Sequence, residues 1–83
     1  MLRVLFFARV REALDCPLLE IPWREELASL DALQRQLEAR GENWPTVLGE
    51  DNMIRSVNQV VIEGDCELND GDEVAFFPPV TGG

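Results

Sequence analysis

The sequence contains no lysine and no histidine, and it has only two cysteines, Cys16 and Cys66. Without histidine, the commonest general base and metal ligand is missing. A zinc or iron–sulfur site needs more ligands than two distant cysteines supply. We therefore predict a domain that binds no metal or cofactor of its own. We expect two free thiols in a reducing, cytoplasmic compartment.

Positive charge is also scarce, because seven arginines stand against sixteen acidic residues and give a formal net charge of −9. Nucleic acid and membrane are therefore predicted not to be partners, since binding phosphates requires clustered cations. A basic protein surface suits this charge better, although acidic residues also simply keep a small domain in solution. The apolar run between Arg3 and Arg9 is too short for a signal peptide or a membrane span.

The 83 residues suffice for one domain. Alternation and β-branched residues predict strands over Leu2–Ala8, Leu18–Ile21 and Glu73–Phe77, and a strand over Met53–Glu63 that is split by a bend at Asn58–Gln59. The sequence thus predicts four strand segments, one of them in two pieces.

One clear helix is predicted to begin after Ser29, a suitable N-cap, and to end near Arg40, with Gly41 in the left-handed C-terminal position. Apolar residues at helical spacing line one of its faces: Leu30, Leu33 and Leu37. The following segment 41–52 reads as a loop around a short apolar patch, Val47–Leu48.

The order strand, strand, helix, strand, strand, strand predicts an α+β fold, a mixed sheet of about five strands with one main helix on one face. This is the pattern of the β-grasp, or ubiquitin-like, fold, in which the first and last strands lie side by side at the centre. We expect residues 1–79 to form this domain and residues 80–83 to form a flexible tail, because Pro78–Pro79 stop the last strand.

One helix covers only one sheet face, yet Leu5, Phe7, Ala75 and Phe77 alternate onto the other. We expect these residues, joined by Val61, to form an apolar patch that a partner protein covers. The competing interpretation is that segment 41–52 folds over this face. Arg11 is predicted to lie at the rim of the patch, or else to be an ordinary surface charge.

The chain ends in Val80, Thr81, Gly82 and Gly83. Four extended residues reach roughly 13–14 Å, enough to deliver a terminus into a remote active site. Glycine lacks a β-carbon, so enzyme walls can close on the backbone.

A carboxylate accepts sulfur only after one oxygen becomes a leaving group, and adenylation by ATP would do this. The Gly83 carboxylate would become an adenylate and then a thiocarboxylate, whose ionised sulfur is a nucleophile. The domain has no histidine and no evident catalytic cluster, so we expect a separate enzyme to use the ATP.

Three segments carry a resemblance to a known family: Val4–Ala8 with Val10–Glu12, Val57–Gln59, and the unbroken Asp70–Gly83. On these segments the chain closely resembles the small subunits of molybdopterin synthase, which are ubiquitin-like sulfur carriers. The stretch Asp15–Ser56 matches mainly in pattern and length.

The resemblance implies an E1-like adenylating enzyme, a sulfur donor and a large catalytic subunit as partners. It also implies sulfur transfer to a cyclic pyranopterin precursor by a heterotetramer. By the same resemblance the partner interface comprises eight residues: Phe7, Arg11, Val61, Phe77, Pro78, Pro79, Val80 and Thr81. The subunit itself would carry sulfur without being a catalyst.

Two alternatives stay open at this point. The chain is compatible with a thiocarboxylate carrier for thiamine synthesis, tRNA thiolation or an amino-acid pathway. It is also compatible with a protein modifier whose Gly83 forms amide bonds with other proteins, although a chain without lysine cannot form isopeptide chains on itself. A binding module with an inert tail is disfavoured, because it would not need a bare diglycine end.

Overall fold

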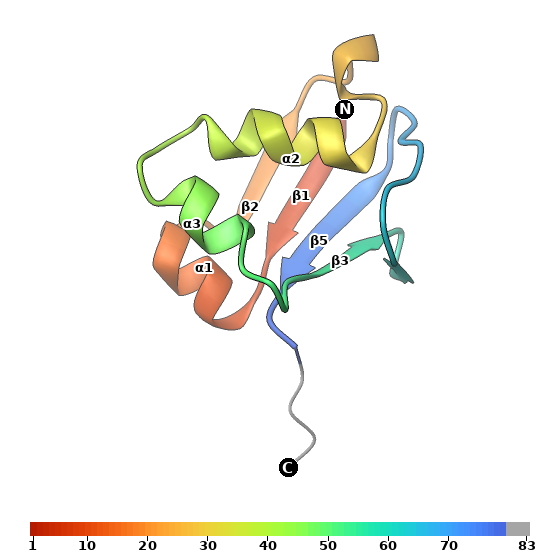
Figure 1. The fold of residues 1–83 in the computed structure, drawn as a ribbon. Coiled ribbons are helices and arrows are strands. Elements are labelled where there is room, and N and C mark those ends of the chain that lie inside the picture. Colours follow the sequence, from red (N-terminus) through yellow and green to blue (C-terminus); the bar gives the residue numbers. More distant parts are fainter. Residues whose placement is uncertain (80–83) are drawn as a thin grey trace.

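Five strands form one mixed sheet in the computed structural model, which describes residues 1–79 (Figure 1). The strands are β1 (Leu2–Phe6), β2 (Leu18–Ile21), β3 (Ile54–Val57), β4 (Val60–Ile62) and β5 (Glu73–Phe77). They lie in the order β2-β1-β5-β3-β4. The central pair, β1 and β5, is parallel, and the other neighbouring pairs are antiparallel. The predicted α+β, β-grasp arrangement is confirmed.

Helix α2 (Leu30–Glu38) lies across one face of this sheet (Figure 1). Ser29 caps its N-terminus as predicted, because the serine hydroxyl accepts a hydrogen bond from the Ala32 N–H at 3.1 Å. The three leucines predicted to face the sheet are fully buried. The other helices are α1 (Ala8–Leu14), α3 (Trp44–Leu48) and the 3₁₀ turn η1 (Glu25–Leu27).

The core lies between the sheet and these helices, and aromatic rings form much of it. Phe6 on β1 stacks with Phe76 on β5 at 5.8 Å between ring centroids. Its ring also meets Trp44 of α3 edge to face at 5.6 Å. These contacts tie α3 to the two central strands. None of the helices in residues 1–79 combines the length and apolar character needed to cross a membrane.

The first strand is shorter than predicted, because Ala8 is the first residue of α1 and not part of β1. Its backbone φ of +53° is left-handed, which ends the extended conformation and turns the chain into α1. The charged stretch Arg9–Glu12 lies within α1. Two residues of α1, Val10 and Leu14, are buried in the core.

The C-terminal end of α2 differs from the prediction. The helix ends at Glu38, with Ala39 as C-cap, and Gly41 has no positive φ. A β-carbon at Gly41 would lie 2.8 Å from Cδ1 of Trp44. The glycine is therefore needed for the close approach of an indole ring and not for a left-handed cap.

The predicted loop around Val47–Leu48 is wrong, because both residues lie in α3. Pro45 occupies its first turn, where proline needs no N–H hydrogen bond. Burial of Trp44 and Leu48 stabilises this five-residue helix, which is too short to form alone.

The predicted bend at Asn58–Gln59 is confirmed as the two-residue turn of the β3–β4 hairpin. Both residues have positive φ, +50° and +71°, as such a turn requires. Asn58 also pairs with the start of β5: its side-chain oxygen accepts from the Glu73 N–H at 3.0 Å. Its amide group donates to Asp72 at 3.0 Å. The hairpin is thus anchored to the central strands.

Candidate functional site

The two central strands are parallel, and their C-terminal ends lie side by side at one end of the sheet (Figure 1). Phe7 follows β1 and donates its backbone N–H to the Phe76 carbonyl at 3.2 Å. The rings of Phe7 and Phe77 meet edge to face, with centroids 6.4 Å apart. Pro78 and Pro79, both half-buried, come directly after this pair. The structure therefore brings Phe7 and Phe77 together at the point where the tail begins.

The face of the sheet opposite α2, here called the outward face, carries apolar side chains from all five strands, and it is charged at the end away from the tail, where Glu20, Arg3 and Glu73 are cross-strand partners. Cross-strand partners form one row over its width: Leu18, Leu5, Ala75, Ser56 and Val61. Phe77 pairs with Ile54 in the next row, toward the tail. Large side chains on this face are open to solvent, with Phe7 45%, Val61 58% and Leu18 37% exposed. Such a contiguous apolar surface is typical of a protein–protein contact.

Segment 41–52 does not cover the outward face, so that competing interpretation is wrong. Its helix α3 contacts α2 and α1, and Trp44 packs against Phe6 on the inward side of the sheet. One detail of the predicted patch also needs correction. Ala75 is only 7% exposed, because its short side chain lies between larger neighbours.

Leu18, Ile54 and Ser56 belong to the outward face but were not predicted to. The alternation within β2 and β3 was visible in the sequence, but it does not say which of two faces a strand presents outward. That choice depends on the pairing register, in which Leu18 lies opposite Leu5 and Ser56 opposite Ala75.

Arg11 lies in α1, and its side chain is exposed. Its backbone N–H reaches the Phe7 carbonyl at 3.4 Å, which places it one helical turn beyond Phe7. Within residues 1–79 the Arg11 guanidinium forms no ion pair. The arginine is therefore available to an acidic group of a partner. The remaining predicted site residues, Val80, Thr81, Gly82 and Gly83, lie outside the described residues.

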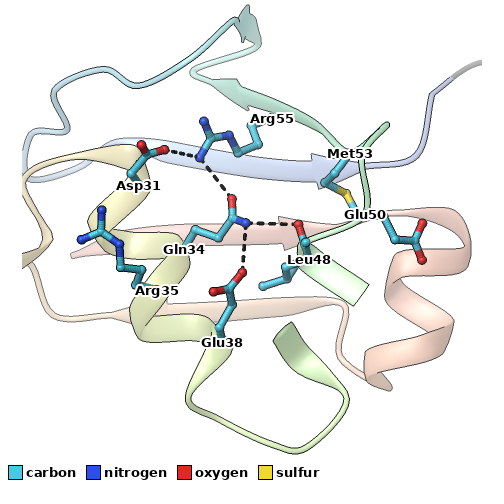
Figure 2. Close-up of a pocket in the computed structure, with 9 residues that line it drawn as sticks. Asp31, Gln34, Arg35, Glu38, Leu48, Glu50, Met53 and Arg55 are labelled. Carbon is cyan, nitrogen blue, oxygen red and sulfur yellow. Dashed lines mark hydrogen bonds and ion pairs between the residues drawn. The ribbon is translucent and has the colours of Figure 1, made fainter. Parts of the chain in front are cut away.

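A hollow lies on the other side of the molecule, between α2 and the segment that joins α3 to β3 (Figure 2). Its polar groups already bond with one another. Arg55 donates to Asp31 at 2.8 Å and to Gln34 at 3.1 Å. Gln34 in turn donates to Glu38 and to the Leu48 carbonyl, both at 3.1 Å. The hollow therefore offers mixed charges held in a structural network.

Neither cysteine is placed as a reactive centre. Both are unpaired and half-buried. Burial, together with the negative charge of Asp65, raises the pKa of the Cys66 thiol, which lowers its thiolate fraction at neutral pH. In the described part of the chain no group of three or more histidine, cysteine or acidic side chains is arranged to hold a metal ion.

Comparison with known proteins agrees with this geometry. The model of the ThiS family matches residues 4–83. The chain is 41% identical to the molybdopterin synthase sulfur carrier subunit of Escherichia coli K12, and 35% identical to that of Haemophilus influenzae. Both matches span 83 residues and the whole of both chains.

Among solved structures, the chain matches one in a protein–protein complex of subunits 1 and 2 of molybdopterin-converting factor from Helicobacter pylori 26695. The TM-score is 0.72 at 26% identity, over 99% of this chain and 97% of that one. The chain therefore belongs to the ThiS family, and its full-length relatives there are named molybdopterin synthase sulfur carrier subunits.

Proposed function

We propose that this protein is the sulfur-carrying subunit of a molybdopterin synthase and that Gly83 carries the sulfur. The observation that supports this most is the Phe7–Phe77 pair, an exposed apolar contact at the base of the segment that ends in Gly82 and Gly83. An apolar sheet face that is followed in the sequence by a diglycine terminus suits a protein that delivers a group into another protein's active site. The names of its close relatives support the same function.

The proposed chemistry begins at the Gly83 carboxylate. One carboxylate oxygen attacks the α-phosphorus of ATP on an E1-like enzyme, and pyrophosphate leaves. A sulfur donor at the oxidation level of sulfide then attacks the acyl carbon and AMP leaves, which yields the thiocarboxylate. Gly82 and Gly83 lack side chains, so the walls of both active sites can approach the backbone closely.

The proposed docking partner is the large catalytic subunit, in which sulfur passes to a cyclic pyranopterin precursor. Phe7, Val61 and Phe77 would supply the apolar contact, and Arg11 a charged contact at its edge. Pro78 and Pro79 would direct Val80 and Thr81 toward the catalytic centre. Because a dithiolene needs two sulfurs, we propose a heterotetramer with two carrier subunits on a dimer of large subunits. The complex of subunits 1 and 2 in the Helicobacter pylori relative supports such a partner.

We place this activity in the cytoplasm. Two unpaired thiols, Cys16 and Cys66, suit a reducing compartment, and a thiocarboxylate also persists there because oxidants are scarce.

Intact-mass measurement of the protein purified from its own cells tests the carrier function. We expect a fraction of the protein to have one sulfur in place of one oxygen, and a variant without Gly83 to lack this form. If Gly83 is instead found in amide bonds with other proteins, the protein is a modifier. A sulfur-bearing form that does not restore molybdopterin synthesis with the large subunit would indicate a carrier for another pathway.

Charge introduced into the apolar contact tests the docking face. We expect Phe7→Asp and Phe77→Asp to abolish binding of the large subunit, because an unpaired carboxylate would be buried there. Val60→Asp is a control at the sheet edge, where Val60 is 61% exposed and pairs with Val57, which lies on the inward side. Circular dichroism checks that each variant is folded. Unchanged binding by both phenylalanine variants would contradict the proposed contact.

A further inference from the structure

Ser56 lies on β3, between central strand β5 and edge strand β4, and it differs from its neighbours on the outward face. It is the one buried polar residue in the described part of the chain, at 6% exposed. Its cross-strand neighbours are Ala75 on β5 and Val61 on β4. The preceding residue, Arg55, bonds with α2 on the inward side, so alternation directs Ser56 outward.

The hydroxyl group of Ser56 has no hydrogen-bond partner among residues 1–79. None of the side-chain hydrogen bonds among residues 1–79 uses Ser56 Oγ. Among residues 1–79, Trp23 Nε1 is the one side-chain polar atom that is fully buried and has no hydrogen-bond partner. Ser56 Oγ also has no partner there, so it is not fully buried. Because Ser56 faces outward, its hydroxyl retains slight contact with solvent.

Short and long side chains lie next to one another around this hydroxyl. Ala75 and Ser56 have short side chains, whereas Phe77, Val61 and Leu18 have larger ones on the same face. A partner that covers the face removes water from Ser56 Oγ. If the buried hydroxyl has no hydrogen-bond partner in the complex, its desolvation weakens binding. If a polar group of the partner bonds with it, this cost is offset.

We propose that Ser56 is a specificity-determining residue of the docking face, and that its hydroxyl forms a hydrogen bond with a polar group of the large catalytic subunit. This inference rests on the proposed function. The apolar side chains that share the outward face with Ser56 provide contact area that many surfaces would accept. Once a partner covers the face, the Ser56 hydroxyl disfavours a surface without a matching polar atom, because burial then leaves the hydroxyl unpaired.

Binding of the full-length protein to the large catalytic subunit, followed by surface plasmon resonance, tests this proposal with Ser56→Ala. We expect the Kd to rise about fivefold to fiftyfold, mostly through faster dissociation, since loss of a contact that exists only in the complex acts on the bound state. The melting temperature of the free variant should stay within about 2 °C of wild type, because the hydroxyl forms no hydrogen bond within residues 1–79.

Ser29→Ala is the matched control. It removes the hydroxyl that caps α2 on the other side of the molecule, so it should lower the melting temperature and leave the Kd unchanged at a temperature where the variant is folded.

Equal or tighter binding by Ser56→Ala, while Phe7→Asp and Phe77→Asp still abolish binding, would overturn the role of Ser56 and leave the proposed function intact. If the two aspartate variants bind normally, the proposal that this face binds the large subunit is wrong. A Ser56→Ala effect on self-association of the free protein, with the Kd for the large subunit unchanged, would also overturn the proposal. In that case the face would serve a second copy of this chain.

Discussion

At the scale of single residues, Asp65 joins the segment after β4 to the N-terminus of α2. Its Oδ1 accepts hydrogen bonds from the N–H of Asp31 at 2.8 Å and from its neighbour Cys66 at 2.9 Å. The hydrogen bond from Asp31 is the main cause that lowers the pKa of Asp65 below its usual 3.8, against an opposing effect of desolvation. The nearby arginines, Arg55 and Arg35, lower it further.

This lowered pKa makes part of the stability depend on pH. Because the folded state binds the proton of Asp65 more weakly than the unfolded state does, the contribution is complete well above pH 3.8 and is lost as pH falls through the folded pKa. We expect Asp65→Asn to lower the melting temperature at pH 7 and to match wild type more closely as pH falls below 3.8 and through the folded pKa. Thermal melts from pH 7 to pH 2.5 measure this difference.

Asp51→Asn is the control for this prediction, because Asp51 is exposed in a turn and its carboxylate forms no hydrogen bond with residues 1–79. Its melting temperature should follow wild type at every pH. A gap between Asp65→Asn and wild type that stays constant over the whole range would show that the charge of Asp65 is not the cause.

At the scale of elements, Arg55 holds α2 against the β3–β4 hairpin (Figure 2). Besides Asp31 and Gln34 of α2, its guanidinium donates to the Gly64 carbonyl at 2.6 Å. Its side chain is only 16% exposed, so these bonds are partly shielded from water. They connect α2 to β3 and to the segment after β4.

We expect Arg55→Ala to lower the free energy of unfolding by about 1–3 kcal/mol, because several hydrogen bonds with a charged donor are lost together. Arg55→Lys should recover only part of this, since an ammonium group cannot reproduce the planar array of donors. Urea unfolding gives the values.

Arg35→Ala provides the comparison for Arg55. Arg35 is exposed on α2, the helix to which Arg55 bonds from β3, and has no ion pair within residues 1–79, so its replacement should change the free energy by no more than about 0.5 kcal/mol. Equal losses in Arg35→Ala and Arg55→Ala would mean that the loss of any arginine in this region, and not of the Arg55 bonds, lowers the stability.

At the scale of the whole molecule, a formal net charge of −9 surrounds an apolar docking face. These two features act on different steps of binding. Long-range attraction to a basic partner surface speeds encounter, whereas apolar contact determines how long the complex persists.

We expect the association rate with the large catalytic subunit to fall about tenfold between 20 mM and 500 mM salt, with little change in the dissociation rate. Stopped-flow fluorescence with a labelled large subunit measures both rates. Ser56→Ala should show the same salt dependence as wild type, because it removes no charge. An association rate that is independent of salt would contradict electrostatic steering.

Several elements could be predicted from the sequence because local chemistry determines them. Ser29 and the leucine spacing predicted α2, and the apolar runs predicted the two central strands. Helix α3 was missed because Trp44–Pro45 reads as a helix breaker and five residues give no period to detect. Its existence depends on Trp44 packing against Phe6, which lies 38 positions earlier in the chain.

The sequence by itself determined that an apolar sheet face and a diglycine end belong to one small domain, because alternation and terminal residues are local properties. Alternation alone places Phe7 and Phe77 on one face. Only the tertiary structure decided that Leu18, Ile54 and Ser56 share that face. The physical reason is strand register: a shift of one residue sends every side chain of a strand to the other face, and register is set by contacts between distant segments.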